Sequence, residues 1–201
     1  MTYKKHFEAI LCMLLCCITL SAQEYGSYTD PRDGREYLTV QIGQQLWMAE
    51  NMAYKTDNPK VIYREDTPFL DVFGRYYSWE IAIEVCPEGW HLPSEDEWDL
   101  LAESLGGHKA AGGKMKRISM YWTAEIDSTS NSSGFSALPA GFMETPKDVT
   151  FTFMGDLGLF WTAGEKNRSD AFLRYVDIES DHLKDGSGGK ESGLSVRCVK
   201  D

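Results

Sequence analysis

A tight turn that leads directly into a helix is predicted by the stretch Cys86–Trp98, CPEGWHLPSEDEW. Proline and glycine occupy the turn, and Ser94 then stands three residues before Glu97. This spacing is that of a capping box, in which each side chain satisfies a free backbone amide at the helix start. Acidic residues in the first turn also suit the positive end of the helix dipole. The helix is expected over residues 94–105, with a stop at Gly106-Gly107.

The first 22 residues have the pattern of a signal peptide. A basic start is followed by the apolar run 9–20, which only Thr19 interrupts. About twelve apolar residues are too few to cross a bilayer, which needs roughly 20. Ser21-Ala22 supplies the small residues that a signal peptidase requires, so cleavage is expected there. The chain is therefore predicted to be exported and then secreted, periplasmic or held on the outer cell surface, with no transmembrane segment left after cleavage.

Two alternatives to a cleaved signal peptide stay open. One is a short membrane anchor or buried helix, and the other is lipidation at Cys16 or Cys17. Lipidation is the less favoured of the two processing routes, because the residue before each cysteine is not small. After cleavage, residues 23–34 are interpreted as a short polar leader and residues 35–201 as a single domain.

The mature chain is strongly acidic. Removing Lys4, Lys5 and Glu8 changes the totals from 20 basic and 31 acidic residues to 18 and 30, a net charge of −12. Such a surface repels nucleic acid and anionic lipid, so neither is expected as a partner. The remaining 179 residues are enough for one domain with a real core. The acidity itself is most simply explained by solubility.

Cysteine usage changes with the predicted cleavage, since only Cys86 and Cys198 remain. An even pair in an exported chain favours a disulfide. Closing so long a loop stabilises a domain by about 4–5 kcal/mol in the chain-entropy account. Two buried free thiols are the alternative. A zinc site is not expected, because the chain has no CxxC pattern and no close cluster of cysteine and histidine.

The pattern of apolar residues predicts a mixed α+β domain. Residues 36–48 are expected to form a hairpin that turns at Gly43-Gln44, residues 55–68 a loop, and residues 73–86 an amphipathic helix. After residue 107 no further helix is expected, and Ala111–Lys114 is interpreted as a turn. Short apolar runs there predict strands of a twisted antiparallel sheet with long loops. These runs are 120–124, 134–142, 149–153, 157–163, 171–178 and 194–199.

Several segments, in this order, resemble one known family. They are Val40–Asn51, Gly74–Trp79, Cys86–Trp98, Ala111–Lys116, Ser133–Gly141 and Ser195–Asp201. Together they resemble the Fibrobacter succinogenes major paralogous domain over nearly the whole mature chain. That family consists of exported bacterial proteins, and it is similar in turn to C-type-lectin-like and formylglycine-generating-enzyme folds. The resemblance implies a C-type-lectin-like domain with two helices packed on a twisted antiparallel sheet and with its termini close together.

The same kinship allows an enzyme to be considered, but the required residues are missing. Formylglycine-generating enzymes need a redox-active cysteine pair, and only Cys198 corresponds to a family cysteine. Related iron enzymes need a histidine triad, whereas His91, His108 and His182 are widely spaced. The chain is therefore expected not to be an enzyme and to have no catalytic residues, no metal and no cofactor.

Calcium binding of the lectin type is also not expected. The carboxylate and amide motifs of that site are absent from the sequence. Two acidic clusters remain, Glu125 with Asp127, and the alternating set Asp177, Glu179 and Asp181. Oxygen-rich clusters can hold calcium, but a solvated strand face is the favoured interpretation.

The expected function is an exported, non-catalytic binding or adhesion module that recognises a glycan or a surface protein. By analogy with lectin-like folds, the ligand would contact loops before the last strands. The candidate ligand-binding residues are Trp161, Glu165, Asn167, Arg168, Asp170, Tyr175 and His182. An ordinary hairpin loop is the structural alternative. The other functions left open are a structural or assembly component of the cell envelope, and a degenerate relative of formylglycine-generating enzymes.

Overall fold

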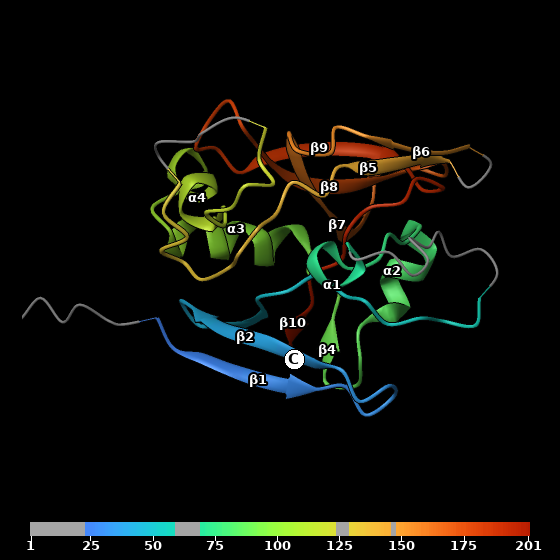
Figure 1. Ribbon diagram of the computed structural model, residues 1–201, viewed down its shortest axis with the longest axis horizontal. Coiled ribbons are helices and arrows are strands. Elements are labelled where there is room, and N and C mark those ends of the chain that lie inside the picture. Colours follow the sequence, from blue (N-terminus) through green and yellow to red (C-terminus); the bar gives the residue numbers. More distant parts are fainter. Residues whose placement is uncertain (1–22, 59–68, 124–128, 146–147) are drawn as a thin grey trace, which may run out of the picture.

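A computed structural model describes residues 23–58, 69–123, 129–145 and 148–201. The predicted signal peptide, with Cys16 and Cys17, lies outside these residues, and so does the pair Glu125 and Asp127. Figure 1 shows a lower sheet and an upper group of strands, with the helices between and beside them. Within the described residues the domain is mixed α+β, and every pairing between its named strands is antiparallel, as the sequence predicts.

The lower sheet has five strands in the order β1-β2-β3-β10-β4. Their bounds are β1 Tyr25–Thr29, β2 Glu36–Ile42, β3 Gln45–Met48, β4 Trp90–His91 and β10 Val199–Lys200. The expected hairpin at 36–48 is confirmed, with Ile42 paired to Gln45 and a positive φ of 59° at Gly43. The interpretation of residues 25–29 as polar leader is wrong, because β1 pairs with β2 along its whole length. The first and last strands thus share one sheet.

The upper strands form two separate sheets. One is the hairpin of β5 Phe142–Thr145 and β6 Asp148–Thr152, and the other has the order β7-β8-β9. The latter strands are β7 Leu157–Glu165, β8 Asp170–Asp177 and β9 Lys184–Gly189. Three predicted strands, over 149–153, 157–163 and 171–178, are therefore confirmed. The segment 120–123 forms a turn instead, and most of 134–142 and 194–199 makes only isolated bridges.

The predicted capped helix is confirmed as α3, Glu95–Ser104. The Ser94 side chain accepts from the Glu97 backbone, and the Glu97 side chain accepts from the Ser94 backbone. Both Gly106 and Gly107 then adopt positive φ and end the helix. Local chemistry alone accounts for this element.

The expected helix over 73–86 is wrong in its first half. The chain forms α1, Leu70–Phe73, and then α2, Trp79–Val85, with an extended stretch between them. Gly74 has a φ of +72°, and a side chain there would place a Cβ 2.6 Å from the carbonyl oxygen of Met52. Tyr77 exchanges backbone hydrogen bonds with Leu194. Contacts with distant segments thus override the helical spacing of the apolar residues.

A further helix, α4 at His108–Met115, replaces the turn expected at Ala111–Lys114. Two glycines in its centre made a helix improbable from propensity alone. Packing favours glycine at both positions, because the backbone of Asp181 and His182 crosses the helix at Gly112, and the Asp181 side chain lies against Gly113. The backbone contact excludes a side chain at Gly112, whereas a side chain at Gly113 would require the Asp181 carboxylate to move.

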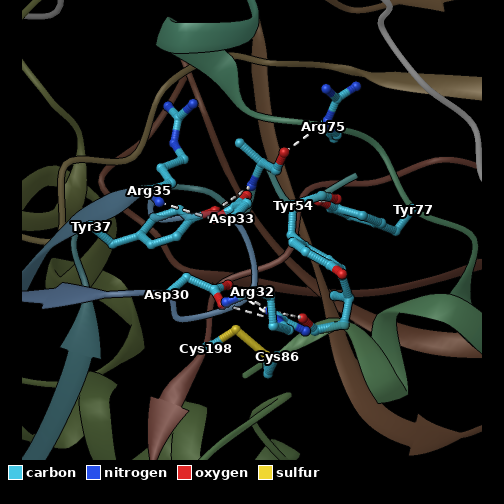
Figure 2. A network of polar contacts seen from close by, with 12 residues as sticks. Asp30, Arg32, Asp33, Arg35, Tyr37, Tyr54, Arg75, Tyr77, Cys86 and Cys198 are labelled. Carbon is cyan, nitrogen blue, oxygen red and sulfur yellow. Dashed lines mark hydrogen bonds and ion pairs between the residues drawn. A yellow bond between two sulfur atoms is a disulfide. The ribbon is translucent and has the colours of Figure 1, made fainter. Parts of the chain in front are cut away.

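The disulfide between Cys86 and Cys198 is present, as predicted, and joins the end of α2 to the residue before β10. Beside it, Figure 2 shows polar contacts that hold the turn after β1. Arg32 donates to Asp30 at 2.7 Å and to the Val85 carbonyl at 2.9 Å, and its guanidinium lies 3.9 Å from the centre of the Tyr54 ring. These contacts fasten the lower sheet to α2 around the disulfide.

The core also contains a fully buried cation, Arg197. It donates hydrogen bonds to Asn51 Oδ1 and to the carbonyls of Met48, Phe135 and Ser136. Burial lowers the pKa of Arg197 to about 9. This value is still above neutral pH, so the guanidinium stays protonated. The side chain therefore connects its own segment to two others, 48–51 and 135–136, through its donors.

Candidate functional site

A cleft of about 520 Å³ lies over one face of the β7-β8-β9 sheet. In an antiparallel pair, residues directly opposite each other share a face. Leu159 pairs with Tyr175, Leu173 with Gly186, and Tyr175 with Lys184, so these side chains form one surface. Leu159, Leu173 and Tyr175 line the floor of the cleft.

The walls of the cleft come from the neighbouring hairpin and from the chain before β10. They include Phe142 and Phe153, whose stacked rings have centroids 6.2 Å apart, and Leu194. Leu157, the first residue of β7, also lines the cleft. Phe153 is 53% exposed. Its φ of +55° lies in the left-handed region, which bulky side chains rarely adopt. An exposed aromatic held in an unfavourable backbone conformation at the mouth of a cleft is a recognised sign of a functional position.

On one side the cleft is bounded by two glycines of β9, which have no side chains. Gly186 and Gly188 both line it, and each lies directly across from a residue of β8. A Cβ at Gly186 would lie 2.8 Å from Leu173 Cδ1, so Leu173 leans across the bare backbone of β9. The apolar floor therefore continues to the outer edge of the sheet.

Charged groups gather at the rim, and most of them are acidic. Asp156, Asp177, Glu179 and Lys184 line the cleft, and Lys184 Nζ lies 2.5 Å from Asp177 Oδ2. The hydrogen bond to Asp177 raises the pKa of Lys184. Burial opposes ionisation of Asp177, but hydrogen bonds, first of all from Lys184, outweigh it and lower the pKa of that carboxyl. The rim thus carries one satisfied ion pair and an excess of negative charge.

Of the residues predicted to bind a ligand, Tyr175 is the one that lines the cleft. Glu165 ends β7, Asp170 begins β8, and Asn167 and Arg168 lie in the turn between these strands. Asn167 Oδ1 accepts hydrogen bonds from the backbone amides of Ser169 and Asp170, at 2.8 and 2.9 Å. Glu165 pairs with Lys190 at 2.6 Å. Much of the hydrogen-bonding capacity that suggested a ligand loop is therefore used by the hairpin itself.

Two of the predicted ligand residues lie elsewhere. Trp161 is fully buried, and its indole nitrogen donates to the Tyr77 carbonyl at 2.8 Å, so its ring is not available to stack on a ligand. His182 is exposed, and its backbone packs on α4 at Gly112. The seven predicted residues therefore do not form one surface.

The acidic set Asp177, Glu179 and Asp181 does not act as the regular strand face that was expected. Asp177 ends β8, and its carboxylate accepts from the backbone amides of Glu179 and Ser180 as well as from Lys184. Asp181 Oδ1 lies 3.9 Å from Lys116 Nζ. Among the described residues no group of three or more histidine, cysteine or acidic side chains is arranged to hold a metal ion.

A second polar group joins the start of α3 to the end of the chain. His91 Nδ1 lies 2.6 Å from Asp201 Oδ1, and His91 Nε2 lies 2.7 Å from Glu97 Oε1. Burial of the ring opposes protonation, but the hydrogen bonds to Asp201 and Glu97 outweigh it and raise the pKa of His91 above its usual 6.5. The folded protein therefore holds this proton more tightly than the unfolded chain does.

The stability of the protein is consequently expected to depend on pH through His91. The contribution is complete below pH 6.5 and is lost as the pH rises through the higher pKa of the folded state. His91→Gln should remove this fall, and Asp201→Asn should reduce it. Urea unfolding measured at several pH values between about 6 and 8 checks the expectation. A His91→Gln variant with the same pH dependence as the parent protein would contradict it.

The cleft was hardly predictable from the sequence. β7 has apolar residues on both faces, so its pattern does not show which face stays open to solvent. Phe142 and Phe153 come from a hairpin that meets the sheet only in the tertiary structure. The only sequence signal for the edge of the cleft is in Lys184–Gly189, where glycines alternate with polar residues. This segment has no apolar residue, so the apolar pattern did not predict a strand there.

The structure thus defines an antiparallel α+β domain with one disulfide and an apolar, acid-rimmed cleft. None of the helices in the described residues has the length and apolar character needed to cross a bilayer. Residues 40–200 match the Fibrobacter succinogenes major domain, and the chain belongs to this family. No curated protein and no solved structure matches the chain.

Proposed function

We propose that the chain is an exported, non-catalytic binding module, built on a lectin-like scaffold, whose ligand surface is the apolar cleft. The cleft itself is the observation that carries the proposal. Its volume of about 520 Å³ lies within the range typical of ligand pockets, which are concave and mostly apolar with a few placed polar groups. The α+β architecture, with its first and last strands in one sheet, supports the scaffold.

The lining favours a protein ligand over a glycan. Leucine and phenylalanine side chains make up most of the floor and walls, including Leu157, Leu159, Leu173 and Phe142. Sugars require many hydrogen bonds, whereas the main cation of the cleft, Lys184, is already paired with Asp177. Burying apolar side chains of a partner contributes about 25 cal/mol for each Å² removed from water. We therefore place an apolar segment of a partner protein in the cleft.

Phe153 provides the test, because it is exposed at the mouth of the cleft. The purified protein would be applied in parallel to a peptide array and a glycan array, together with Phe153→Ser. We expect a peptide ligand whose affinity falls about tenfold in the variant, since burial of a large aromatic contributes roughly 1.5–3 kcal/mol. Met120→Ser is the matched control, because Met120 is 92% exposed and lies outside the cleft.

Each other outcome has a defined meaning. A glycan ligand that depends on Phe153 would retain the binding module but replace the partner class. Ligands that bind the parent protein, Phe153→Ser and Met120→Ser equally would place the binding surface elsewhere and overturn the assignment of the cleft. No ligand on either array would overturn the proposal and favour a structural or assembly role in the envelope.

A further inference from the structure

The outer edge of β9 is free along the side of the cleft. β9 pairs with β8 over six residues, from Lys184 to Gly189. It is the last strand in the order β7-β8-β9, and no other strand of the described chain pairs with it. Along an unpaired edge, backbone N–H and C=O groups remain available to another chain.

The residues of β9 themselves give this edge little of the usual protection against pairing. Proteins normally block an edge strand with outward charges, proline or a covering segment. The two charges of β9 are instead drawn onto the neighbouring strand, because Lys184 pairs with Asp177 and Asp185 lies 3.1 Å from Arg174. The rest of the strand is glycine and serine. A second strand can therefore approach without a bulky side chain in its way.

The position of an added strand follows from sheet geometry. It would lie about 4.8 Å from β9, with alternate side chains on the face of the sheet that carries the cleft. On that face β9 presents Gly186 and Gly188, and beyond them lie Leu173 and Tyr175. Side chains of the added strand would thus reach over bare glycine into the apolar floor. This geometry selects apolar residues at every second position of the partner.

The charge of the rim selects the residues at the ends of the added segment that share the cleft face, because the alternate residues of a strand face away from the cleft. Asp156 and Glu179 line the cleft and have no ion-pair partner among the described residues. The whole chain also has a net charge of −11. Complementary charge across an interface accelerates association and discriminates against partners of like charge. Basic residues at the ends of the segment, on the same face as its apolar residues, would satisfy the rim.

We infer that the cleft receives an extended cationic peptide segment of a partner protein, which adds as a strand to the free edge of β9. The inference rests on the proposed binding function and specifies its ligand. In this mode main-chain hydrogen bonds give affinity, and pockets for alternate side chains give specificity. Apolar side chains enter over Gly186 and Gly188, and lysine or arginine residues face Asp156 and Glu179.

The test uses a synthetic seven-residue peptide and two N-methylated forms of it. The peptide has lysine at positions 1 and 7, valine or phenylalanine at positions 3 and 5, and serine at positions 2, 4 and 6, so that lysine and apolar residues share one face. One form is methylated on the amides that face β9, and the other on the alternate amides that face away. We expect the first methylation to weaken binding at least about tenfold and the second to have little effect, since only the first removes donors to the edge. Calorimetry gives the affinities, and NMR shifts of the Gly186 and Gly188 amides locate the peptide.

Two further variants test the charge and the cleft. Glu179→Gln should weaken the lysine peptide by about threefold at low salt and less at high salt. A peptide with glutamate in place of lysine should not bind. Phe153→Ser should weaken the lysine peptide as it weakens array ligands.

The inference and the proposed function can fail separately. Equal binding of the two methylated forms, with dependence on Phe153 retained, would overturn strand addition and leave the binding cleft standing. The same conclusion follows if an array ligand depends on Phe153 while the lysine peptide does not bind. Loss of every Phe153-dependent ligand would overturn both.

Discussion

Removing the Cys86–Cys198 disulfide is expected to lower the free energy of unfolding by about 4–5 kcal/mol. The two cysteines are 112 residues apart, so their bond closes a loop of more than half the chain. In the chain-entropy account, stabilisation grows with loop length because an uncrosslinked unfolded chain has more conformations. Total stabilities of domains this size are only about 5–15 kcal/mol, so the loss is a large fraction.

The measurement is urea unfolding of the parent protein and of Cys86→Ala. This single substitution removes the bond but leaves the Cys198 sulfur in the core, where it is fully buried. Adding Cys198→Ala should cost further stability through lost packing. Unfolding of the parent protein under reducing conditions is the control, and it should resemble Cys86→Ala. A loss below about 1 kcal/mol would mean that the unfolded chain is restricted without the bond.

Trp161→Ala is expected to destabilise the protein by about 3–5 kcal/mol, the range for large aromatic residues in cores. The side chain has no exposed surface, and it packs in the cluster that contains Tyr77 and Leu173. Truncation would leave a cavity beside Leu173, which lines the floor of the cleft, and would remove the hydrogen bond to the Tyr77 carbonyl. Any loss of ligand binding in this variant would then follow from loss of folding.

Two further variants, measured in the same unfolding experiment, serve as controls for the loss of core packing in Trp161→Ala. Trp161→Phe keeps an aromatic ring, and the Tyr77 carbonyl still accepts from the Leu194 amide. Trp161→Phe should therefore lower the free energy of unfolding clearly less than Trp161→Ala does. Arg168→Ala, at an exposed position of the adjacent turn, should change stability by no more than about 0.5 kcal/mol. Native-like stability of Trp161→Ala would contradict the assignment of this residue to the core.

Features that depend on neighbouring residues were predictable from the sequence. The Ser94–Glu97 capping box, the stop at Gly106-Gly107 and the turn at Gly43 all formed where expected. The disulfide was predictable for another reason, because only two cysteines remain after the expected cleavage. In each case a few side chains close in sequence, or a forced choice of partner, decide the outcome.

The candidate site depended on distant contacts and was mostly missed. Of the predicted ligand residues, Tyr175 lines the cleft, whereas Trp161, which was expected at the surface, is fully buried. The polar loop that follows Trp161 correctly indicates an exposed turn, but it shows only where β7 ends and not whether the Trp161 side chain is exposed. Which face of a strand is covered depends on the layer packed against it.

The sequence by itself thus determined the mixed α+β class, the capped helix, the first hairpin and the disulfide pair. Only the tertiary structure decided that the glycines of α4 stay helical beneath residues 181–182, and that glycine-rich β9 is a strand at all. It also decided that Phe142 and Phe153 meet the β7-β8-β9 sheet to form a cleft. The physical reason is one of range. Caps and turns are stabilised by hydrogen bonds within a few residues, whereas glycine packing, edge strands and clefts are stabilised by contacts between segments far apart in the chain.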